Sequence, residues 1–168
     1  MVAVSVAAET APGELLGLDV GALPDAGLID AMTAARRWAS RVQAVELAAV
    51  TELVRRRFAE DTDSGVEAVS PRDYVHDEVA EALTITANAA DDLIRFAAQL
   101  TRRLPGTYAA LAAGDIDYGK ARTLWHGTDQ VSDELAAIVE AEVLPRAPDQ
   151  TTGEIPGEGS AAGQATRS

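Results

Sequence analysis

Apolar residues recur at helical spacing along most of the chain, and no stretch alternates apolar and polar residues in the way of a β-strand. The longest helical pattern runs from Asp25, a suitable N-cap, to about Ala59. Its apolar positions form two neighbouring stripes, one through Met32, Ala35, Ala39, Val42, Ala49 and Leu53 and the other through Leu47, Val50, Val54 and Phe58. We expect a face this wide to be buried on two sides. We also expect Arg55, Arg56 and Arg57 to end the helix, because cations complement its C-terminal dipole.

Shorter helical patterns follow a polar stretch, residues 60–71, which we expect to be a loop. The spacing predicts helices over residues 72–83, 87–103, 108–113, 117–127 and 132–144. Pro105 stops the second of these, Gly114 supplies a turn after the third, and Ser132 is the predicted N-cap of the last. In that last helix the apolar stripe is Leu135, Val139 and Val143. The chain therefore predicts an all-α fold with one multi-helix domain over residues 25–148.

The two ends of the chain lack this periodicity. Residues 1–24 carry several Gly and Pro and predict a flexible N-terminal arm, while residues 149–168 are rich in Gly, Ser and Thr and predict a disordered tail. The apolar run at residues 2–8 follows no Lys or Arg and precedes Glu9, so it is a poor signal peptide. Nothing approaches the roughly 18 apolar residues of a membrane span, and we expect a cytoplasmic protein.

Composition narrows the chemistry. Only 4% of the 168 residues are aromatic against 47% apolar in all, so we expect an interior of Ala, Leu, Val and Ile. The absence of Cys excludes disulfides, thiolate nucleophiles and the usual structural zinc sites. A net charge of −13 repels phosphate backbones and anionic lipid at long range, which disfavours nucleic acid and membrane as partners.

No residue set predicts catalysis, a metal site or a cofactor site. His76 and His126 are the only histidines, and two ligands do not make a zinc site, so we expect them to be exposed or capping residues. Asp91 and Asp92 are neighbours on one helix, where their side chains diverge by about 100° and cannot share a proton, and we expect them on a solvated face.

One acidic string resembles part of a calcium-binding loop. It runs from Asp115 through Asp117 to Gly119, but its twelfth position is His126 instead of a bidentate Glu. We therefore expect Asp117 to cap a helix.

Residues 78–94 have the apolar spacing of a helix-turn-helix, with Ala80, Leu83 and Ile85 at the packing positions and Thr86 capping the second helix. The weak candidates for DNA contact are Asn88, which could bind an adenine edge, and Arg95. Asp91 and Asp92 lie between them and oppose phosphate binding, so a purely structural helix pair is the favoured interpretation.

Motifs in the second half of the chain point to a family. They are the run from Arg102 to Arg122 containing Leu-Pro-Gly and Gly-Asp-Ile, then Val-Ser-Asp-Glu at 131–134, Leu-Pro-Arg-Ala-Pro at 144–148 and Thr-Thr-Gly-Glu at 151–154. In this order and spacing they resemble the actinobacterial domain of unknown function 222, also called the thirteen-E-twelve repeat family. The resemblance extends over about residues 25–154.

Members of this family typically continue into a second helical portion and an HNH-type endonuclease domain that uses His and Asn around a divalent metal. The resemblance thus implies a role beside a DNA-cleaving domain, in mobile or repeated genetic elements. After Glu154, however, the family continues with an Arg-rich helix, whereas this chain has Ile-Pro-Gly and no later His. We therefore expect a truncated member without the nuclease residues.

Three functional hypotheses follow from the sequence. The favoured one is a non-catalytic helical accessory domain of an HNH-endonuclease-linked family. The alternatives are a helix-turn-helix DNA-binding module and a protein-interaction module, which could self-associate through the helix between Met32 and Phe58.

Overall fold

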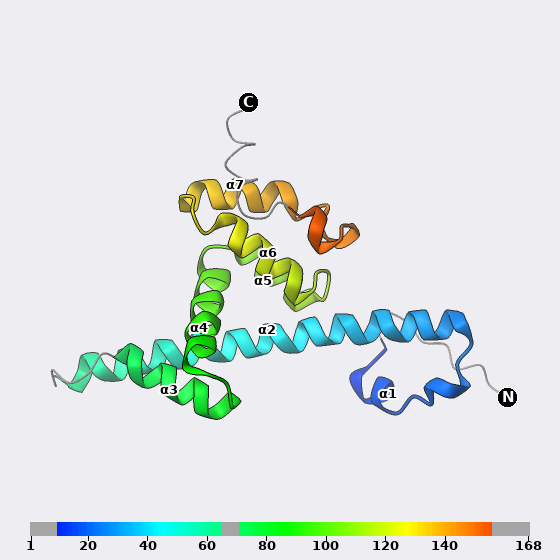
Figure 1. The fold of residues 1–168 in the computed structure, drawn as a ribbon, viewed down its shortest axis with the longest axis horizontal. Coiled ribbons are helices and arrows are strands. Elements are labelled where there is room, and N and C mark those ends of the chain that lie inside the picture. Colours follow the sequence, from blue (N-terminus) through cyan, green and yellow to red (C-terminus); the bar gives the residue numbers. More distant parts are fainter. Residues whose placement is uncertain (1–9, 65–70, 156–168) are drawn as a thin grey trace.

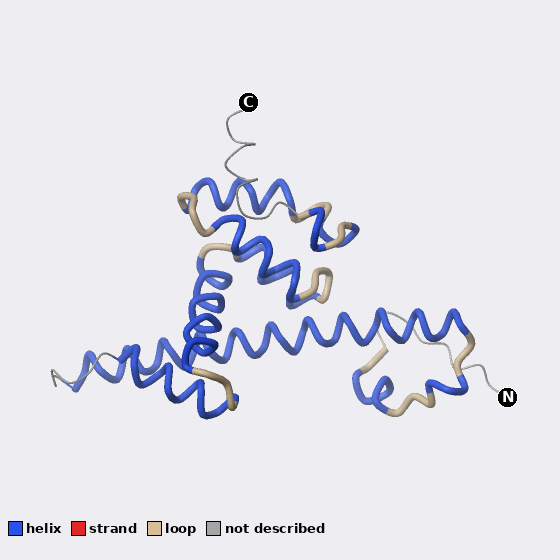
Figure 2. The backbone as a smooth tube through the Cα atoms, viewed as in Figure 1, coloured by secondary structure: helices blue, strands red, loops and turns tan. Residues whose placement is uncertain are grey.

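The structure is a computed structural model that describes residues 10–64 and 71–155. These residues form seven α-helices and three short 3-10 turns, with no β-strand among them, which confirms the all-α fold. Short loops join most of the helices (Figure 2). The helices are α1 (Pro12–Leu16), α2 (Asp25–Ser64), α3 (Pro71–Leu83), α4 (Ala87–Arg102), α5 (Pro105–Ala113), α6 (Tyr118–Thr128) and α7 (Asp133–Val143). The 3-10 turns are η1 (Val20–Ala22), η2 (Ala147–Asp149) and η3 (Thr152–Glu154).

The helix α2 is the spine of the molecule. Its 40 residues span about 60 Å at 1.5 Å per residue. Figure 1 shows α3 and α4 against its C-terminal half and α1 below its N-terminal end, while α5, α6 and α7 lie above it. Helix α6 contacts α4, and α7 contacts α5 and α6. Helices α6 and α7 are therefore connected to α2 mainly through α4 and α5.

The prediction that the arginines at 55–57 end this helix is wrong, since it continues to Ser64. The guanidinium groups of Arg55 and Arg56 bind the Glu52 carboxylate one turn back, at 2.7 and 2.8 Å, and Arg57 binds Glu78 of α3 at 2.6 Å. They therefore support the helix and fasten it to α3. Of the predicted loop over 60–71, residues 65–70 lie outside the described residues.

Only one face of α2 is buried, which corrects the expectation of burial on two sides. Ala44, Leu47 and Val50 are buried under α3, α4 and α5, and Leu53 and Val54 pack at the edge of the core. Most of the other predicted stripe faces outward, with Met32 and Val42 65% and 63% exposed. The apolar pattern is wide because the helix carries an exposed apolar strip beside its buried face.

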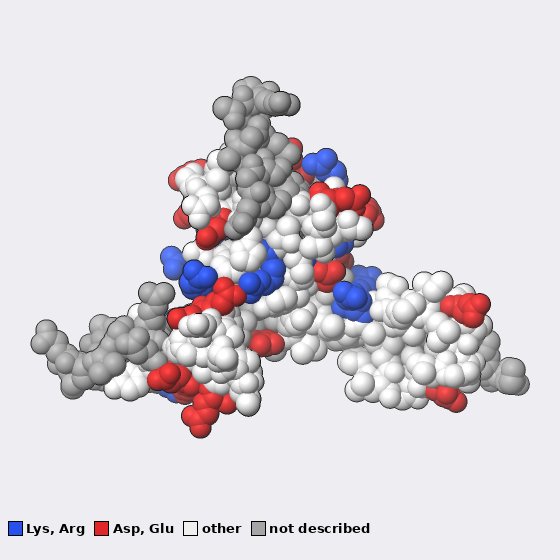
Figure 3. Space-filling view, in the orientation of Figure 1, with Lys and Arg blue, Asp and Glu red and all other residues white. Residues whose placement is uncertain are grey.

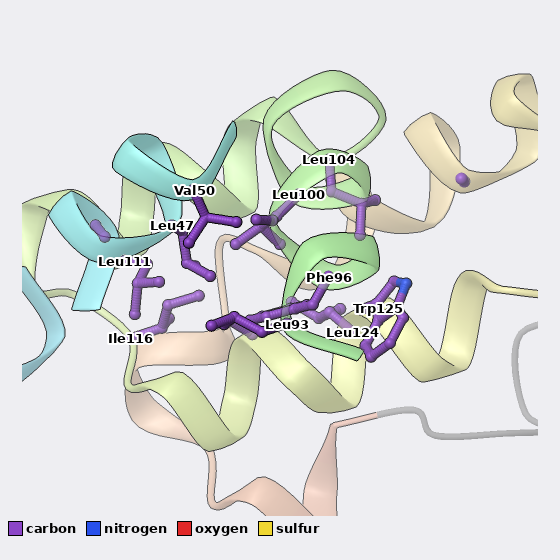
Figure 4. Packing of buried hydrophobic residues seen from close by; sticks show 14 of the residues in the cluster. Leu47, Val50, Leu93, Phe96, Leu100, Leu104, Leu111, Ile116, Leu124 and Trp125 are labelled. Atoms are coloured by element: carbon purple, nitrogen blue, oxygen red, sulfur yellow. The ribbon is translucent and has the colours of Figure 1, made fainter. Parts of the chain in front are cut away.

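The core lies where α2, α4, α5 and α6 meet (Figure 4). Its members are mostly Ala, Leu, Val and Ile as expected, but two large rings lie at its centre. Phe96 and Trp125 are 0% and 2% exposed, with ring centroids 5.1 Å apart. The expectation that the interior contains no large rings is therefore wrong at the centre of the core, where two of the few aromatic residues lie together.

The structured part of the chain is longer at both ends than the sequence predicted. Residues 10–24, expected in the flexible arm, include α1 and η1, and the Trp38 indole donates a hydrogen bond to the Thr10 carbonyl at 2.7 Å. At the other end Ile155 is buried against the core, and the side chain of Glu154 caps the backbone N–H of Thr151 at 2.7 Å. Residues 1–9 and 156–168, which hold the rest of the predicted arm and tail, lie outside the described residues.

The start of α5 is capped from another helix. Its N-cap, Leu104, has no polar side chain, and the buried carboxylate of Glu140 on α7 takes over. One oxygen of Glu140 accepts hydrogen bonds from the backbone N–H and the hydroxyl of Thr107, at 2.6 and 2.8 Å. A Cβ on Gly106 would lie 2.8 Å from the Leu144 side chain and 3.1 Å from that of Glu140. A side chain at this position would therefore have to displace the ends of the Leu144 and Glu140 side chains.

Substituting Gly106 by Ala should lower the free energy of unfolding by about 1–3 kcal/mol, because the added methyl group has to displace the side chains of Leu144 and Glu140. Urea denaturation followed by circular dichroism measures this. The matched control is Gly13→Ala in α1, where nothing lies within 4 Å of the added Cβ. Equal midpoints for the Gly106 variant and wild type would show that the α5–α7 contact is loose.

Candidate functional site

The segment with helix-turn-helix spacing forms a helix pair with a tight turn. Thr84 has φ 54, in the left-handed region that β-branched residues rarely adopt. The N–H of Ile85 bonds the Ala80 carbonyl at 3.0 Å, and the Thr86 hydroxyl accepts from the N–H of Ala89 at 3.3 Å, so it caps α4 as predicted. The turn between α3 and α4 is thus closed at both sides by local hydrogen bonds.

Both weak candidates for DNA contact are exposed and lie in one place. Asn88 and Arg95 line a shallow hollow of about 520 Å³ together with Asp91 and Asp92. The guanidinium of Arg95 donates a hydrogen bond to Asp92 at 3.1 Å. Arg95 and, from α6, Arg122 neutralise these carboxylates, so the hollow has no excess of positive charge to attract a phosphate backbone.

The neighbouring carboxylates have different partners, as their divergence on the helix predicted. Asp91 lies 2.7 Å from Nδ1 of His76 on α3, while Asp92 accepts a hydrogen bond from Arg122 on α6 at 2.7 Å. Burial raises the pKa of Asp92, but the hydrogen bonds from Arg122 and Arg95 outweigh it and hold the pKa below its usual value. The expectation of a merely solvated face is therefore wrong, since both side chains link α4 to other helices.

An arginine packed on aromatic rings lies next to this network. The guanidinium carbon of Arg122 is 5.3 Å from the ring centroid of Phe96 and 5.0 Å from that of Trp125. The ring of Tyr118 meets Phe96 edge-on at 5.2 Å, and burial raises the pKa of the Tyr118 hydroxyl. The sequence analysis missed this cluster, although Tyr118, Arg122 and Trp125 lie at i, i+4 and i+7 on one helix face.

The histidines are neither exposed nor capping, contrary to expectation. His76 is half-buried beside Asp91, and the ring of His126 stacks on Trp125 at 4.5 Å between centroids. In the described part of the chain no three His, Asp or Glu side chains lie close enough to hold a metal ion. Asp117, from the calcium-loop-like string, caps α6 by accepting from the N–H of Lys120 at 2.9 Å.

A polar groove of about 590 Å³ lies between the first third of α2 and the α5–α6 turn. Arg36 and Arg37 of α2 face Asp117 and Asp115 across it, at 3.8 and 3.3 Å. Gly114, with φ 77, has its Cβ position 2.9 Å from the Arg37 carbonyl, so only glycine fits this turn. The carboxylates neutralise the cations in this groove, and the ion pairs between them fasten α2 to the α5–α6 turn.

A second, apolar groove of about 430 Å³ lies at the start of α2, next to the polar groove, and Met32 lines both. It is lined by Leu15, Leu18, Val20, Leu28, Ala31, Met32 and Ala35. The α1 end of the molecule is white and red in the space-filling view, with Lys and Arg only further along α2 (Figure 3). The sequence analysis missed this groove because one wall falls in the predicted arm.

Comparison with known proteins identifies the family. The sequence model of a family described as a domain of unknown function, DUF222, matches residues 34–156, about three quarters of the chain. The chain belongs to the DUF222 family. Searches of curated proteins and of solved structures found no match. None of the helices in the described residues is long and apolar enough to cross a membrane.

The DUF222 segment contains the motifs noted in the sequence, and their residues contact one another. Gly106 of the Leu-Pro-Gly motif lies against Leu144 of Leu-Pro-Arg-Ala-Pro, and the Lys120 ammonium donates to the carbonyls of Ala147 and Pro148 at 2.8 and 3.1 Å. These motif residues therefore hold the helices together. The apolar groove lies almost wholly before the matched segment, which contains only Ala35 of its lining.

Substituting Asp92 by Asn should destabilise the protein in a pH-dependent way. The pKa of Asp92 is lower in the folded state, so its stabilising contribution is complete above about pH 5 and is lost as the pH falls through the folded pKa. Because the side chain is 34% exposed and screened by solvent, we expect a loss of about 0.5–1 kcal/mol at pH 7.

Urea denaturation of wild type and variant at pH 7 and about pH 3 measures the difference, which should shrink at the lower pH. Asp77→Asn, at an exposed carboxylate of α3, is the matched control. A loss in the free energy of unfolding that is the same at both pH values would contradict a stabilising ion pair between Asp92 and Arg122.

Proposed function

We propose that this DUF222 chain is a non-catalytic helical accessory domain, linked in function to an HNH endonuclease, that works through contacts with other proteins. The observation that carries the non-catalytic part is that the candidate acids and bases serve structure. Asp92 bonds Arg122, Asp117 caps α6, and the buried Glu140 caps α5. The link to an HNH endonuclease rests on the resemblance of the motifs.

A helix-turn-helix DNA-binding module is the second candidate. Its support is that Asn88 and Arg95 are both exposed on the first turns of α4 and line one hollow. The absence of excess positive charge in that hollow and the net charge of −13 count against it, because nonspecific DNA affinity comes mostly from cations at phosphates.

Protein contact is favoured by an exposed apolar strip on the middle of α2. Val42 and Val45 are 63% and 68% exposed, and Ala39 and Ala49 beside them are small and exposed. Exposed apolar patches of this kind mark protein interfaces when they are contiguous. We propose the strip, defined as Ala39, Val42, Val45 and Ala49, as the surface for self-association.

Incubated with supercoiled plasmid and Mg²⁺ or Mn²⁺, the purified chain should leave the DNA intact, because Asp91, Asp92 and His76 are engaged in contacts between helices. Agarose gels over several hours measure nicking. The variant His76→Ala distinguishes the chain's own activity from a contaminant, since His76 and Asp91, 2.7 Å apart, are a histidine–carboxylate pair of the kind that acts in acid–base catalysis.

Nicking by wild type that the His76 variant lacks would contradict the non-catalytic proposal. Binding of the intact plasmid, seen as slower migration in the gel, would favour the DNA-binding module instead. That binding should weaken at higher salt and in the variants Asn88→Ala and Arg95→Ala.

Self-association through the strip predicts a dimer that Val42→Asp converts to monomer, because a carboxylate at a contact between apolar surfaces is not solvated. Sedimentation equilibrium of both proteins measures this. Val42 is suited to the test because it is exposed, whereas Leu53 packs against the core and its substitution would unfold the domain. Ile138→Asp on α7, at 61% exposure, is the control. A monomeric wild type, or a dimer retained by the Val42 variant, refutes this use of the strip.

A further inference from the structure

The start of the described chain combines an apolar surface with one sign of charge. Leu16, Val20, Ile29 and Met32 are each at least 60% exposed, and they lie in or beside the apolar groove. Residues 10–35 carry Glu14, Asp19, Asp25 and Asp30 but no Lys or Arg, and the cations that follow, Arg36 and Arg37, face Asp117 and Asp115. The segment that forms the apolar groove therefore carries charges of one sign only.

We infer that this groove binds an amphipathic helix whose apolar face is flanked by Lys or Arg and which belongs to a partner protein. The inference rests on the proposed function, in that it names the chemistry of a partner that the accessory domain contacts. Laying the apolar side of a helix into a hydrophobic groove is a recurrent mode of recognition.

The shape of the groove suits a helix. Its floor is one face of α2, where Leu28, Ala31, Met32 and Ala35 recur at i, i+3, i+4 and i+7 over about 10 Å, or two turns. Ala31 and Ala35 are small and leave room for side chains of the partner. Leu15, Leu18 and Val20 supply the opposite wall. The volume of about 430 Å³ can therefore receive several apolar side chains presented at the same spacing.

The wall of the groove is fixed to α2. The Trp38 indole bonds the Thr10 carbonyl, and the guanidinium of Arg41 lies 4.7 Å from the centroid of the Trp38 ring. Asp19 caps η1 by accepting from the N–H of Gly21 at 3.1 Å. A groove held in this way loses little conformational freedom when a partner binds, which favours affinity.

The charges select a cationic partner. Glu14 precedes the groove residue Leu15, and Asp19 stands between Leu18 and Val20. Carboxylates this near to the groove act on its occupant within the screening length of about 8–10 Å. Lys or Arg at the border of the partner's apolar face would approach them, which raises both the association rate and the selectivity.

A second copy fits this groove poorly. Its own start brings four more carboxylates to the contact and no cation, and like charges across an interface cost binding energy. Residues 1–9 of this chain are mostly apolar but include Glu9 and no Lys or Arg, so they offer no side-chain cation to the carboxylates beside the groove.

The test uses the full chain and a fluorescent helical peptide of about 18 residues, or five turns, with Leu at i, i+3, i+4 and i+7 and Lys elsewhere. A second peptide has Glu in place of Lys. Fluorescence anisotropy is recorded at about 20 and 150 mM salt. The Lys peptide should bind, more weakly at the higher salt, and the Glu peptide should not.

Two variants locate the binding. Met32→Gln keeps the net charge and removes apolar contact in the groove, so it should weaken binding about tenfold. Ile138→Ser, at a similarly exposed apolar residue of α7 outside the groove, should leave it unchanged. The double variant Glu14→Gln with Asp19→Asn keeps both caps but removes two charges, and should cost about three- to fivefold at low salt.

Equal binding by wild type and Met32→Gln would overturn the proposal, because attraction would then come from the overall charge of −13. Binding that appears only after removal of residues 1–9 would assign the groove to the chain's own start, and a dimer dissociated by Met32→Gln would assign it to a second copy. Each of these outcomes leaves the plasmid assay unchanged, so failure of this inference is distinct from failure of the non-catalytic proposal.

Discussion

The carboxylate of Glu140 binds the start of α5 from within the protein, and the upper half of the molecule depends on that contact. A buried carboxylate is costly unless hydrogen bonds satisfy it, and here both polar hydrogens of Thr107 do so at a helix N-terminus whose dipole favours an anion. Because α5 lies on α2 and α7 carries Glu140, this bond connects the last helix to the spine. Gly106 leaves room for it, since a side chain there would press on Glu140 and Leu144 of the α7 end.

The spine itself is covered unevenly. Helices α3, α4 and α5 bury one face of α2, while Val42 and Val45 on the other side stay exposed. The ion pairs of α2 also connect it to the elements that cover it: Arg57 binds α3, and Arg37 binds the α5–α6 turn. The apolar surface that remains is concentrated on the middle and the start of α2, which is why protein contact is the favoured mode of action.

The starts of several shorter helices could be predicted from the sequence because their causes are local, whereas the end of α2 could not. Thr86, Asp117 and Ser132 cap the helices at the positions expected, and Gly114 makes the predicted turn. Pro105 was expected only to stop the preceding helix and also starts α5, so that helix is longer at its beginning. Which stripe of α2 would be buried was not predictable, since both stripes are apolar and the choice depends on where distant helices pack.

The candidate site, too, has features that follow from local sequence and features that depend on long-range contacts. Asn88 and Arg95 lie together because they share a helix face, and Arg95 reaches Asp92 within that helix. The other partner of Asp92, Arg122, comes from α6, and only the fold brings it there. The groove wall in residues 10–24 was missed because its anchor, the bond from Trp38 to Thr10, joins residues 28 positions apart. Local composition there is that of a loop, and a long-range contact overrides it.

The length of α2 has a consequence for how two bound molecules would be arranged. The groove lies at about Met32 and the α3–α4 pair is fastened at Arg57, which places them roughly 35–40 Å apart along one continuous helix. A helix of this kind bends only gently, so it acts as a rigid spacer. A molecule bound at one end is therefore held at a fixed separation and orientation from a molecule bound at the other.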